Sequence, residues 1–300
     1  MNILKYKKFY YLISAFIILP GLISLVFFGL KPAIDFTGGS EIVMQIQSDK
    51  AVSPKEIEKI IETQGYGVQT ISKGQNGVFM IRTQPLSEND NKKIVAAIKK
   101  QYPKTSEKSF ETVGATIGQE TTINALKAVG IASTAILFYI AFVFRKVSKP
   151  VSSWKYGICA IIALLHDVLL VMGLFSLLGY FFNVEVDSLF ITALLTVMGF
   201  SVHDTIVVFD RIRENLKNHS DYSFEKIVNT SMLETINRSL NTSVTVALVL
   251  FMLLLFGGES IRWFIVALLL GVVSGTYSSI FTASPLLVSW YEFDKKRHKN

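Results

Sequence analysis

The sequence predicts a polytopic α-helical membrane protein with six transmembrane helices and one extracytoplasmic α+β domain of ferredoxin-like topology. Of its 300 residues, 50% are hydrophobic, and the mean hydropathy of +0.42 is too high for an ordinary soluble domain. Six apolar segments have about the 20 residues that a helix needs to cross a bilayer. A single long polar stretch, residues 31–123, separates the first segment from the others.

The spans are expected to alternate with short loops on the two sides of a membrane. Lys5, Lys7 and Lys8 precede the first apolar run, as in a signal peptide, but a run of about 22 residues without a following Ala-x-Ala site favours an uncleaved anchor. The predicted order is a cytoplasmic N-terminus at 1–8, spans at 9–30, 124–144, 156–181, 188–210, 238–256 and 262–290, cytoplasmic loops at 145–155 and 211–237, and a cytoplasmic tail at 291–300.

The distribution of charge predicts the orientation of these spans. The formal net charge is +7, and lysine and arginine gather in the two termini and in the loops at 145–155 and 211–237. The short loops on the other side carry Glu185, Asp187 and Glu259 and no basic residue. Because excess Lys and Arg in short loops marks the cytoplasmic side, both termini are expected in the cytoplasm. Topology, rather than nucleic-acid binding, accounts for the basic balance.

Residues 31–123 have the pattern of a small βαββαβ domain. Helices are expected after the N-cap residues Ser53 and Ser87, and strands at 41–47, 68–73, 78–83 and 109–116. This order is that of the ferredoxin-like fold. The stretch contains no His and no Cys, which favours a binding or docking role over catalysis.

Two further segments have an interpretable local pattern. Asp35-Phe36-Thr37-Gly38-Gly39 follows the first span and indicates a turn that enters a strand, because glycine permits positive φ and close backbone approach. The loop at 211–237 is expected to contain an amphipathic helix that covers the bilayer interface or a neighbouring helix through Phe224, Ile227, Val228 and Leu233.

The fourth span carries the strongest functional signal, Asp204. At 1.5 Å per residue Asp204 lies about 24 Å from the outer end of its helix, where an ionised side chain costs several kcal/mol. It shares a helix face with Ser201 and Arg211. We interpret Asp204 as a proton-binding residue; the alternative is a structural aspartate, hydrogen-bonded to a neighbouring helix. His203 points about 100° away and suits packing as well as proton transfer.

The fifth span predicts a counter-charge for Asp204. Its uninterrupted apolar part is too short to cross a bilayer unless four polar residues enter the membrane, and these lie on one helix face: Arg238, Asn241, Thr242 and Thr245. Counted from the outer end, Arg238 is about 27 Å deep, close to the level of Asp204. The alternative is an interfacial arginine that only follows the charge rule for topology.

The third span contains a second pair, His166-Asp167. Neighbours on a helix point apart and no HExxH motif is present, so a metal site is disfavoured; proton relay or interhelical packing suits Asp167 better. Cys159 is the only cysteine and is interpreted as a small buried hydrophobe. No metal and no cofactor is expected.

Together these motifs resemble those of the SecD/SecF family of bacterial protein-export membrane proteins, on its SecF side. The resemblance covers essentially the full length, and its most specific part is GFSVHDTIVVFDRIREN at 199–215. It rests also on DFTGG at 35–39, on AxxHDVxxxxG from Ala163 to Gly173, and on INRSLNTS at 236–243. Many relatives have Asn where this chain has His203.

The resemblance implies a member of the resistance–nodulation–division superfamily that forms a heterodimer with a SecD-like subunit. It implies that the complex assists a SecYEG-type translocon in the bacterial cytoplasmic membrane and uses the proton motive force to promote late steps of preprotein translocation, without enzymatic activity. The family motif includes Asp35, Gly38 and Gly39. The implied proton pathway consists of Asp204, Arg238 and Thr242, with weaker candidates at His203, Asp167, Ser201 and Asn241.

Three other functions are compatible with parts of the pattern. A half-size proton-coupled efflux transporter of the same superfamily would use the same Asp204 and Arg238, but efflux members usually carry a larger outer domain pair. An intramembrane aspartyl protease would use Asp167 and Asp204, but neither lies in a GxGD context. A structural stabiliser of the translocon would need no proton coupling.

Overall fold

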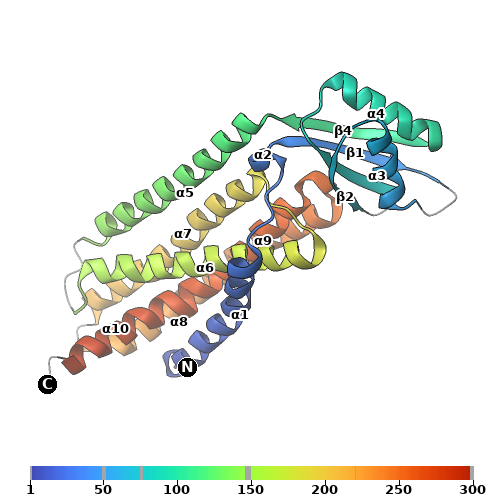
Figure 1. Ribbon diagram of the computed structural model, residues 1–300. Coiled ribbons are helices and arrows are strands. Elements are labelled where there is room, and N and C mark those ends of the chain that lie inside the picture. The colour runs from blue at the N-terminus through green and yellow to red at the C-terminus, as the bar shows by residue number, and fades with distance from the viewer. Residues whose placement is uncertain (1, 49–51, 75–76, 146–149, 220, 298–300) are drawn as a thin grey trace. The chain divides into compact units, whose positions relative to one another are not determined.

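The computed structural model describes residues 2–48, 52–74, 77–145, 150–219 and 221–297. The chain divides into two compact units (Figure 1): a membrane unit of residues 1–31 and 127–300, and an α+β unit of residues 32–126. Apolar helices make up the first, and a small antiparallel sheet with its helices makes up the second. This confirms the predicted fold class.

Six helical stretches within the described residues are long and apolar enough to cross a membrane. They are α1 (Lys7–Phe28), α5 (Ala115–Val143), α6 (Ser153–Phe182), α7 (Ser188–Asn218), α8 (Phe224–Phe256), and α9 (Arg262–Ser278) continued through a π-turn, η4 (Ser279–Ala283), into α10 (Ser284–Arg297). Pro285 has no N–H to donate to the preceding turn, and the helix passes this point by the wider π-turn. Two short 3-10 turns precede α1 and α9, at Leu4–Tyr6 and Glu259–Ile261.

The cytoplasmic loop expected at 211–237 is almost entirely helical. α7 continues to Asn218, and α8 starts at Phe224, where the Ser223 hydroxyl accepts from the backbone N–H of Lys226 at 3.3 Å. The predicted amphipathic segment is therefore the first part of α8 rather than a separate helix. Its apolar residues Phe224, Ile227 and Val228 are buried in the main core of the membrane unit, so they cover neighbouring helices.

Glycines set the closest helix contacts of the membrane unit. A Cβ atom on Gly21 of α1 would lie 2.8 Å from the Cα atom of Gly173 on α6. Likewise, a Cβ atom on Gly275 of α9 would lie 3.0 Å from the Cβ atom of Ser201 on α7. Small residues at helix interfaces let backbones approach and are typical of membrane bundles. These contacts hold α9 directly against the helix that carries Asp204.

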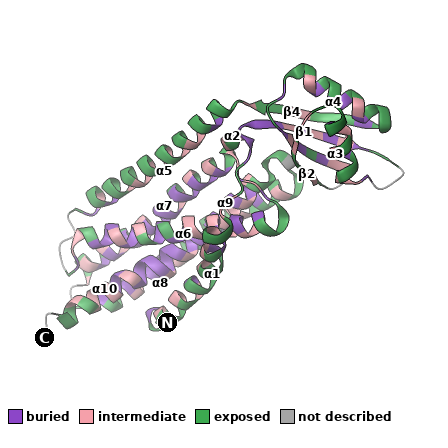
Figure 2. Ribbon diagram, viewed as in Figure 1, coloured by how far each residue is buried: buried purple, intermediate pink, exposed green. Residues whose placement is uncertain are grey.

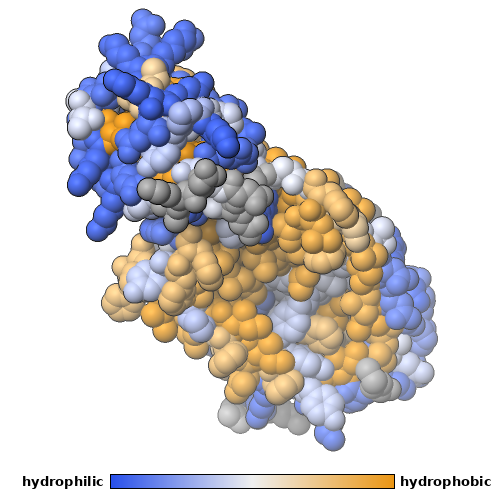
Figure 3. All heavy atoms as spheres, turned by 90° about the vertical axis from the view of Figure 1, so that its right-hand side faces the viewer, coloured by the Kyte–Doolittle hydropathy of each residue, from blue (hydrophilic) through white to orange (hydrophobic). Residues whose placement is uncertain are grey.

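Large parts of the surface of the membrane unit are apolar. Figure 3 shows hydrophobic side chains gathered over it, whereas hydrophilic ones cover the α+β unit. Figure 2 shows α5 exposed along most of its length; its exposed residues include Leu126, Ile131 and Phe138. Inside, Phe144, Tyr156 and Phe209 are buried with ring centroids 5.2–5.9 Å apart. Phe144 and Tyr156 are stacked and Phe209 meets both edge to face, arrangements that aromatic pairs prefer.

The α+β unit has the expected βαββαβ order. Its elements are a short helix α2 (Ile34–Thr37), then β1 (Gly39–Ile46), α3 (Pro54–Thr63), β2 (Val68–Lys73), β3 (Val78–Thr83), α4 (Glu88–Gln101) and β4 (Thr105–Val113). The four strands form one antiparallel sheet in the order β2-β3-β1-β4. β4 lies earlier in the chain than the predicted 109–116, because α5 already begins at Ala115.

Alternation along the strands places one sheet face on α3 and α4. The shared core is formed by Ile42 and Met44 of β1, Phe79 and Ile81 of β3, and the isoleucines at 57, 61, 94 and 98 of the two helices. Both helices begin at a capping box, Ser53 with Glu56 and Ser87 with Asp90, which satisfies free backbone N–H groups at the helix start.

The Gly38-Gly39 pair joins α2 to β1 and allows two close backbone contacts. Both residues have positive φ, 72° and 125°, and a Cβ atom on Gly38 would lie 2.9 Å from the Cα atom of Ala115 at the start of α5. A Cβ atom on Gly39 would lie 2.8 Å from the carbonyl oxygen of Thr83 on β3. The segment with Asp35, predicted as a turn that enters a strand, is a one-turn helix closed by the two glycines, and it leads into β1.

Candidate functional site

Asp204 lies on the inner face of α7, shielded from the surface of the unit. The residue is 2% exposed, and its neighbours on that face, Ser201, Thr205 and Val208, are buried as well. Its Oδ2 atom is buried and has no hydrogen-bond partner. An unpartnered buried polar atom costs about 1–3 kcal/mol, and such atoms in native proteins usually mark strained, catalytic or ion-binding positions.

His203 lies next to Asp204 but faces outward. Its side chain is 64% exposed, and its Nδ1 atom is 3.7 Å from Asp204 Oδ1, beyond hydrogen-bond distance. The histidine is therefore a surface residue of α7 whose charge, when it is protonated, acts on the buried carboxylate.

Arg238 and the polar stripe of α8 lie on the exposed face of that helix. Arg238, Asn241, Thr242 and Thr245 are all exposed. Two of the hydroxyl groups bind their own helix: Thr242 donates to the Arg238 carbonyl at 3.0 Å and Thr245 to that of Asn241 at 2.8 Å. The charge of Arg238 acts on Asp204, but among the described residues no ion pair within 4.0 Å joins the two side chains. The structure thus places them within electrostatic reach and not in contact.

A charged cavity of about 550 Å³ opens beside Arg238, with room for many water molecules. It is lined mainly by α7 and α8 through Ile206, Val207, Asp210, Arg211, Arg213, Glu214, Glu234, Thr235 and Arg238, together with Val143 of α5. Arg211 forms ion pairs with Glu214 and Glu234, both at 2.7 Å. The cavity provides a polar environment within one helical turn of Asp204, since Val207 follows it by three residues.

Asp167 is the second buried carboxylate and has a different environment. It is 0% exposed, and it accepts three hydroxyl hydrogen bonds of 2.6 Å each, from Ser201 of α7 and from Ser274 and Ser278 of α9. The Nδ1 atom of its neighbour His166 lies 3.0 Å from Oδ1. One side chain of α6 therefore ties together three helices.

The polar residues of α9 were missing from the predicted site. Ser274 and Ser278 face Asp167, whereas Thr276, between them on α9, donates to the Val272 carbonyl of its own helix at 2.9 Å and contacts the Ser243 hydroxyl of α8. The only sequence signal was the spacing of the two serines by four residues in an otherwise apolar span, which places them on one helix face. Ser201, a weaker candidate from the sequence, contacts Asp167 rather than Asp204.

No metal-binding cluster is present in the part of the chain that the structure describes: no three His, Cys, Asp or Glu side chains are grouped so that they could hold an ion. Cys159 is buried within the core.

The fold and the site together define a polytopic membrane protein that carries ionisable groups inside its helix bundle. Two family models match the chain: "Protein export membrane protein SecD/SecF, C-terminal" over residues 93–293 and "SecD/SecF GG Motif" over residues 23–50. The chain belongs to the SecD/SecF family of protein-export membrane proteins.

Individual relatives agree with this assignment. The chain is 48% identical to the protein translocase subunit SecF of Thermobaculum terrenum, covering 98% of this chain and 95% of that protein. It is 35% identical to the SecDF protein of Bacillus subtilis, but spans only 37% of it. The crystal structure of SecDF from Thermus thermophilus matches with a TM-score of 0.84 and 31% identity, over 97% of this chain and 38% of that one.

Proposed function

We propose that this chain is the SecF-like subunit of a proton-driven accessory complex of the Sec translocon, in which Asp204 binds and releases the driving proton. The complex promotes the translocation of preproteins across the cytoplasmic membrane of a bacterium. The observation that carries this proposal is the Asp204 carboxylate, 2% exposed, with one oxygen lacking any hydrogen-bond partner.

The surroundings of Asp204 suit reversible protonation. Burial disfavours the ionised carboxylate, and the positive charges of Arg238 and protonated His203 favour it. The charged cavity beside Arg238 offers a route for protons from one side. A proton that crosses the full field gains about 2.3 kcal/mol per 100 mV, enough to change a two-state equilibrium more than about tenfold.

The exposed polar stripe of α8 supports a second subunit. Guanidinium and amide groups facing lipid are costly, so Arg238 and Asn241 call for a polar neighbour inside the membrane. A SecD-like chain is the natural candidate, because the SecDF relatives and structures extend well beyond the region that this chain matches. The heterodimer would enclose the pathway that this chain lines on one side only.

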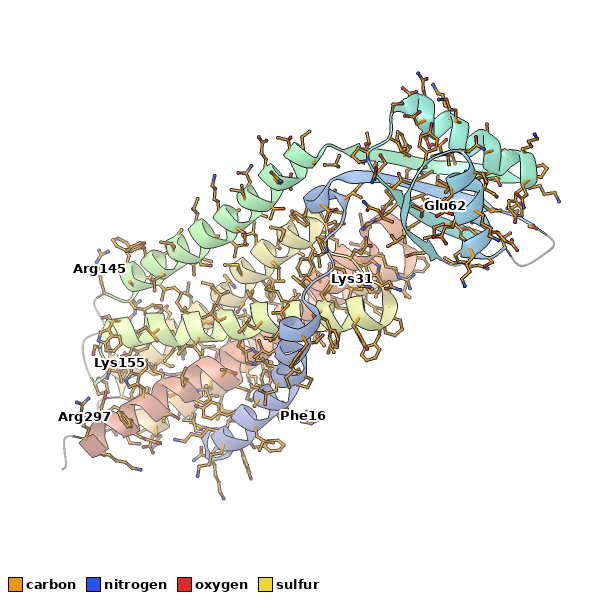
Figure 4. All side chains as sticks on the ribbon, viewed as in Figure 1. Phe16, Lys31, Glu62, Arg145, Lys155 and Arg297 are labelled. Carbon is orange, nitrogen blue, oxygen red and sulfur yellow. The ribbon has the colours of Figure 1, made fainter. Side chains whose placement is uncertain are left out.

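Contacts at one end of the membrane unit support cytoplasmic termini. The backbone N–H of Ile3 donates to Asn229 near the start of α8 at 2.7 Å, and Lys155 near the start of α6 pairs with Asp294 near the end of α10. Figure 4 shows Arg145, Lys155 and Arg297 at this same end. Both chain ends thus share a side with the basic segments, and the charge rule assigns that side to the cytoplasm.

We also propose that the chain is not an enzyme. An aspartyl protease needs two carboxylates that share one proton, whereas Asp167 is hydrogen-bonded to three serine hydroxyls. The two aspartates are used in different ways, and only Asp204 has a free oxygen.

The test is preprotein export and proton uptake, measured side by side in inverted membrane vesicles that contain the SecD-like partner. Asp204→Asn keeps the shape of the side chain and removes its charge. We expect it to assemble with the partner and to lose both the proton uptake and the stimulation of export by the proton motive force.

Glu225→Gln is the matched control, because this exposed carboxylate lies in the first turn of α8 and does not line the charged cavity. It should retain both activities. Wild-type export in the Asp204→Asn complex would contradict the proposal and leave the chain as a structural stabiliser. Loss of proton uptake together with intact export would favour an efflux transporter.

A further inference from the structure

The His166–Asp167 pair has no part in the proposed role of Asp204, although it is the more elaborate site. Its carboxylate is 0% exposed and receives hydroxyl groups from two other helices. The three O–H···O contacts of 2.6 Å have the length typical of hydrogen bonds to an ionised acceptor, 2.5–2.7 Å. The arrangement is therefore built around a carboxylate anion.

A buried anion in a membrane bundle needs a positive charge beside it. The only basic side chain that contacts Asp167 among the described residues is His166, whose Nδ1 atom lies 3.0 Å from Oδ1. An imidazolium there would make the pair neutral overall. A neutral imidazole would leave one uncompensated negative charge inside the bundle.

The second nitrogen of His166 is also unexplained. The side chain is only 7% exposed, and its Nε2 atom is buried without a hydrogen-bond partner. A nitrogen in this position can take up a proton without first giving up a protein hydrogen bond. The pair thus combines a prepared anion with an unoccupied proton acceptor.

We propose that His166 and Asp167 form a second proton-binding site of the membrane unit, in which His166 binds the proton at Nε2 and the serine-held carboxylate keeps the imidazolium beside it. The step transfers one proton from a hydronium ion to nitrogen, forms one N–H bond and leaves one water molecule. Proton binding at His166 does not depend on the proposed function. Only the use of that proton to drive export rests on it.

A cluster of hydroxyl groups links this site to Asp204. Ser201 donates to Asp167 and precedes Asp204 by three residues on α7. Thr205, next to Asp204, lies 2.8 Å from the Ser279 hydroxyl, which itself donates to the Ser201 carbonyl at 3.1 Å. Protonation at one site can therefore change the packing of α7 and α9 at the other.

Few other groups that titrate face His166. On α9 the Tyr277 ring stacks against it with centroids 6.1 Å apart, and the Tyr277 hydroxyl donates to the backbone of Tyr10 on α1 at 2.8 Å. On α7 the titratable residues His203 and Asp204 follow Ser201, which binds Asp167, by two and three residues, and η4 has no titratable residue. The charged pair Lys155–Asp294, which joins the start of α6 to α10, is eleven residues along the chain from His166.

The experiment is a pH titration by nitrogen NMR of the full chain, labelled with ¹⁵N-histidine and assembled in lipid vesicles with an unlabelled SecD-like partner. The signal of His166 is identified by subtraction in the variant His298→Gln and in His203→Gln and His219→Gln, whose side chains lie against Asp204 and Tyr222. We expect the spectrum of wild-type His166 to contain an imidazolium signal that the neutral signal replaces as the pH rises. In Asp167→Asn the ratio of charged to neutral His166 at a given pH should fall about tenfold.

Three results would overturn the proposal. One is a wild-type His166 that stays neutral over the whole pH range; this result does not depend on the folding of any variant. Another is an unchanged ratio in Asp167→Asn. The third is loss of the imidazolium signal when Na⁺ replaces choline in the buffer, which would make the serine-lined carboxylate a sodium site. Asp204→Asn separates the two proposals: a titrating His166 in a complex whose export ignores Asp204 would preserve this site and refute the proposed function.

Discussion

Asp204 and Asp167 are both buried in the same helix bundle, yet the hydrogen bonding of their carboxylate oxygens differs. Asp167 accepts hydroxyl hydrogen bonds from Ser201, Ser274 and Ser278, and its histidine neighbour contacts it at 3.0 Å. Asp204 has a bare Oδ2 atom and a histidine 3.7 Å away that faces outward. The first carboxylate holds helices together, whereas the second is kept available.

The difference separates a carboxylate that stabilises the bundle from one that lowers its stability. Hydrogen bonds to a charged group contribute about 1.5–3 kcal/mol each, and an unmet buried group costs a similar amount. Asp167 therefore stabilises the bundle, while Asp204 lowers its stability. A residue that is kept at a cost to stability is expected to serve activity.

The largest expected effect is on stability, from Asp167→Ala. The change leaves three buried serine hydroxyls without their acceptor and His166 without its anion, so we expect a loss of about 3–5 kcal/mol and poor assembly with the partner. Asp204→Ala removes no hydrogen bond and should be neutral or stabilising. Thermal unfolding of the two variants in detergent, followed by fluorescence, measures the contrast; equal losses would refute it.

A smaller effect is expected from Arg238→Gln, on activity rather than on stability. Arg238 acts on Asp204 by charge without direct contact, so its removal should lower proton-driven export by about tenfold, the equivalent of about 1.4 kcal/mol. Arg238→Lys keeps the charge and should retain most of the activity. Export assays on vesicles with both variants decide; if Arg238→Lys is as defective as Arg238→Gln, geometry matters more than charge.

Single serines around Asp167 should each contribute a fraction of its effect. Ser278→Ala removes one of three donors, and we expect a loss of about 1–2 kcal/mol. Ser133→Ala on α5 is the control, because that hydroxyl bonds only the Val129 carbonyl of its own helix, at 2.8 Å, and its loss should stay within about 0.5 kcal/mol. The unfolding temperatures of the two variants would be compared; equal shifts would mean that the serine contacts of Asp167 add nothing.

The contrast between the aspartates was only half visible in the sequence. Asp204 was identified by depth alone, since a long apolar span and the rise of a helix suffice to place it. The environment of Asp167 depends on serines 107 and 111 residues away, which only the packing of α9 against α6 brings near. A charged residue within an apolar span can be recognised from the sequence of that span alone. The serines of α9 that bind Asp167 cannot be assigned to it from sequence, because they belong to a different helix.

Other differences between prediction and structure have local causes. The six spans and the βαββαβ order follow from hydrophobic period and helix caps, which act over a few residues. The loop at 211–237 was predicted because polar residues interrupt its apolar pattern. The structure keeps this stretch helical because Phe224 and Ile227 are buried in the main core, a tertiary contact that composition does not show.

A partly exposed carboxylate of the α+β unit, Asp90, extends the comparison toward water and gives the smallest expected effect. At the start of α4, hydrogen bonds from the hydroxyls of Ser87 and Tyr66 lower the pKa of Asp90 from 3.8 to about 2. A carboxyl group with a depressed folded-state pKa stabilises the fold above its unfolded pKa, and this stabilisation is lost as the pH falls through the folded value. The α+β unit should therefore lose stability between about pH 4 and pH 2.

Ser87→Ala tests this directly, because it removes the first of those hydrogen bonds. The midpoint of Asp90, followed by carboxyl-carbon NMR of the full chain, should rise from about 2 toward 3.8. The acid sensitivity of the unit, measured by pulse proteolysis with pepsin in urea, should diminish. Ser109→Ala, on β4 and away from this cap, should change neither. If Ser87→Ala leaves the midpoint unchanged, the hydroxyl hydrogen bond does not set the pKa of Asp90. The stabilising role given to the three serine hydroxyls around Asp167 would then lose its simplest support.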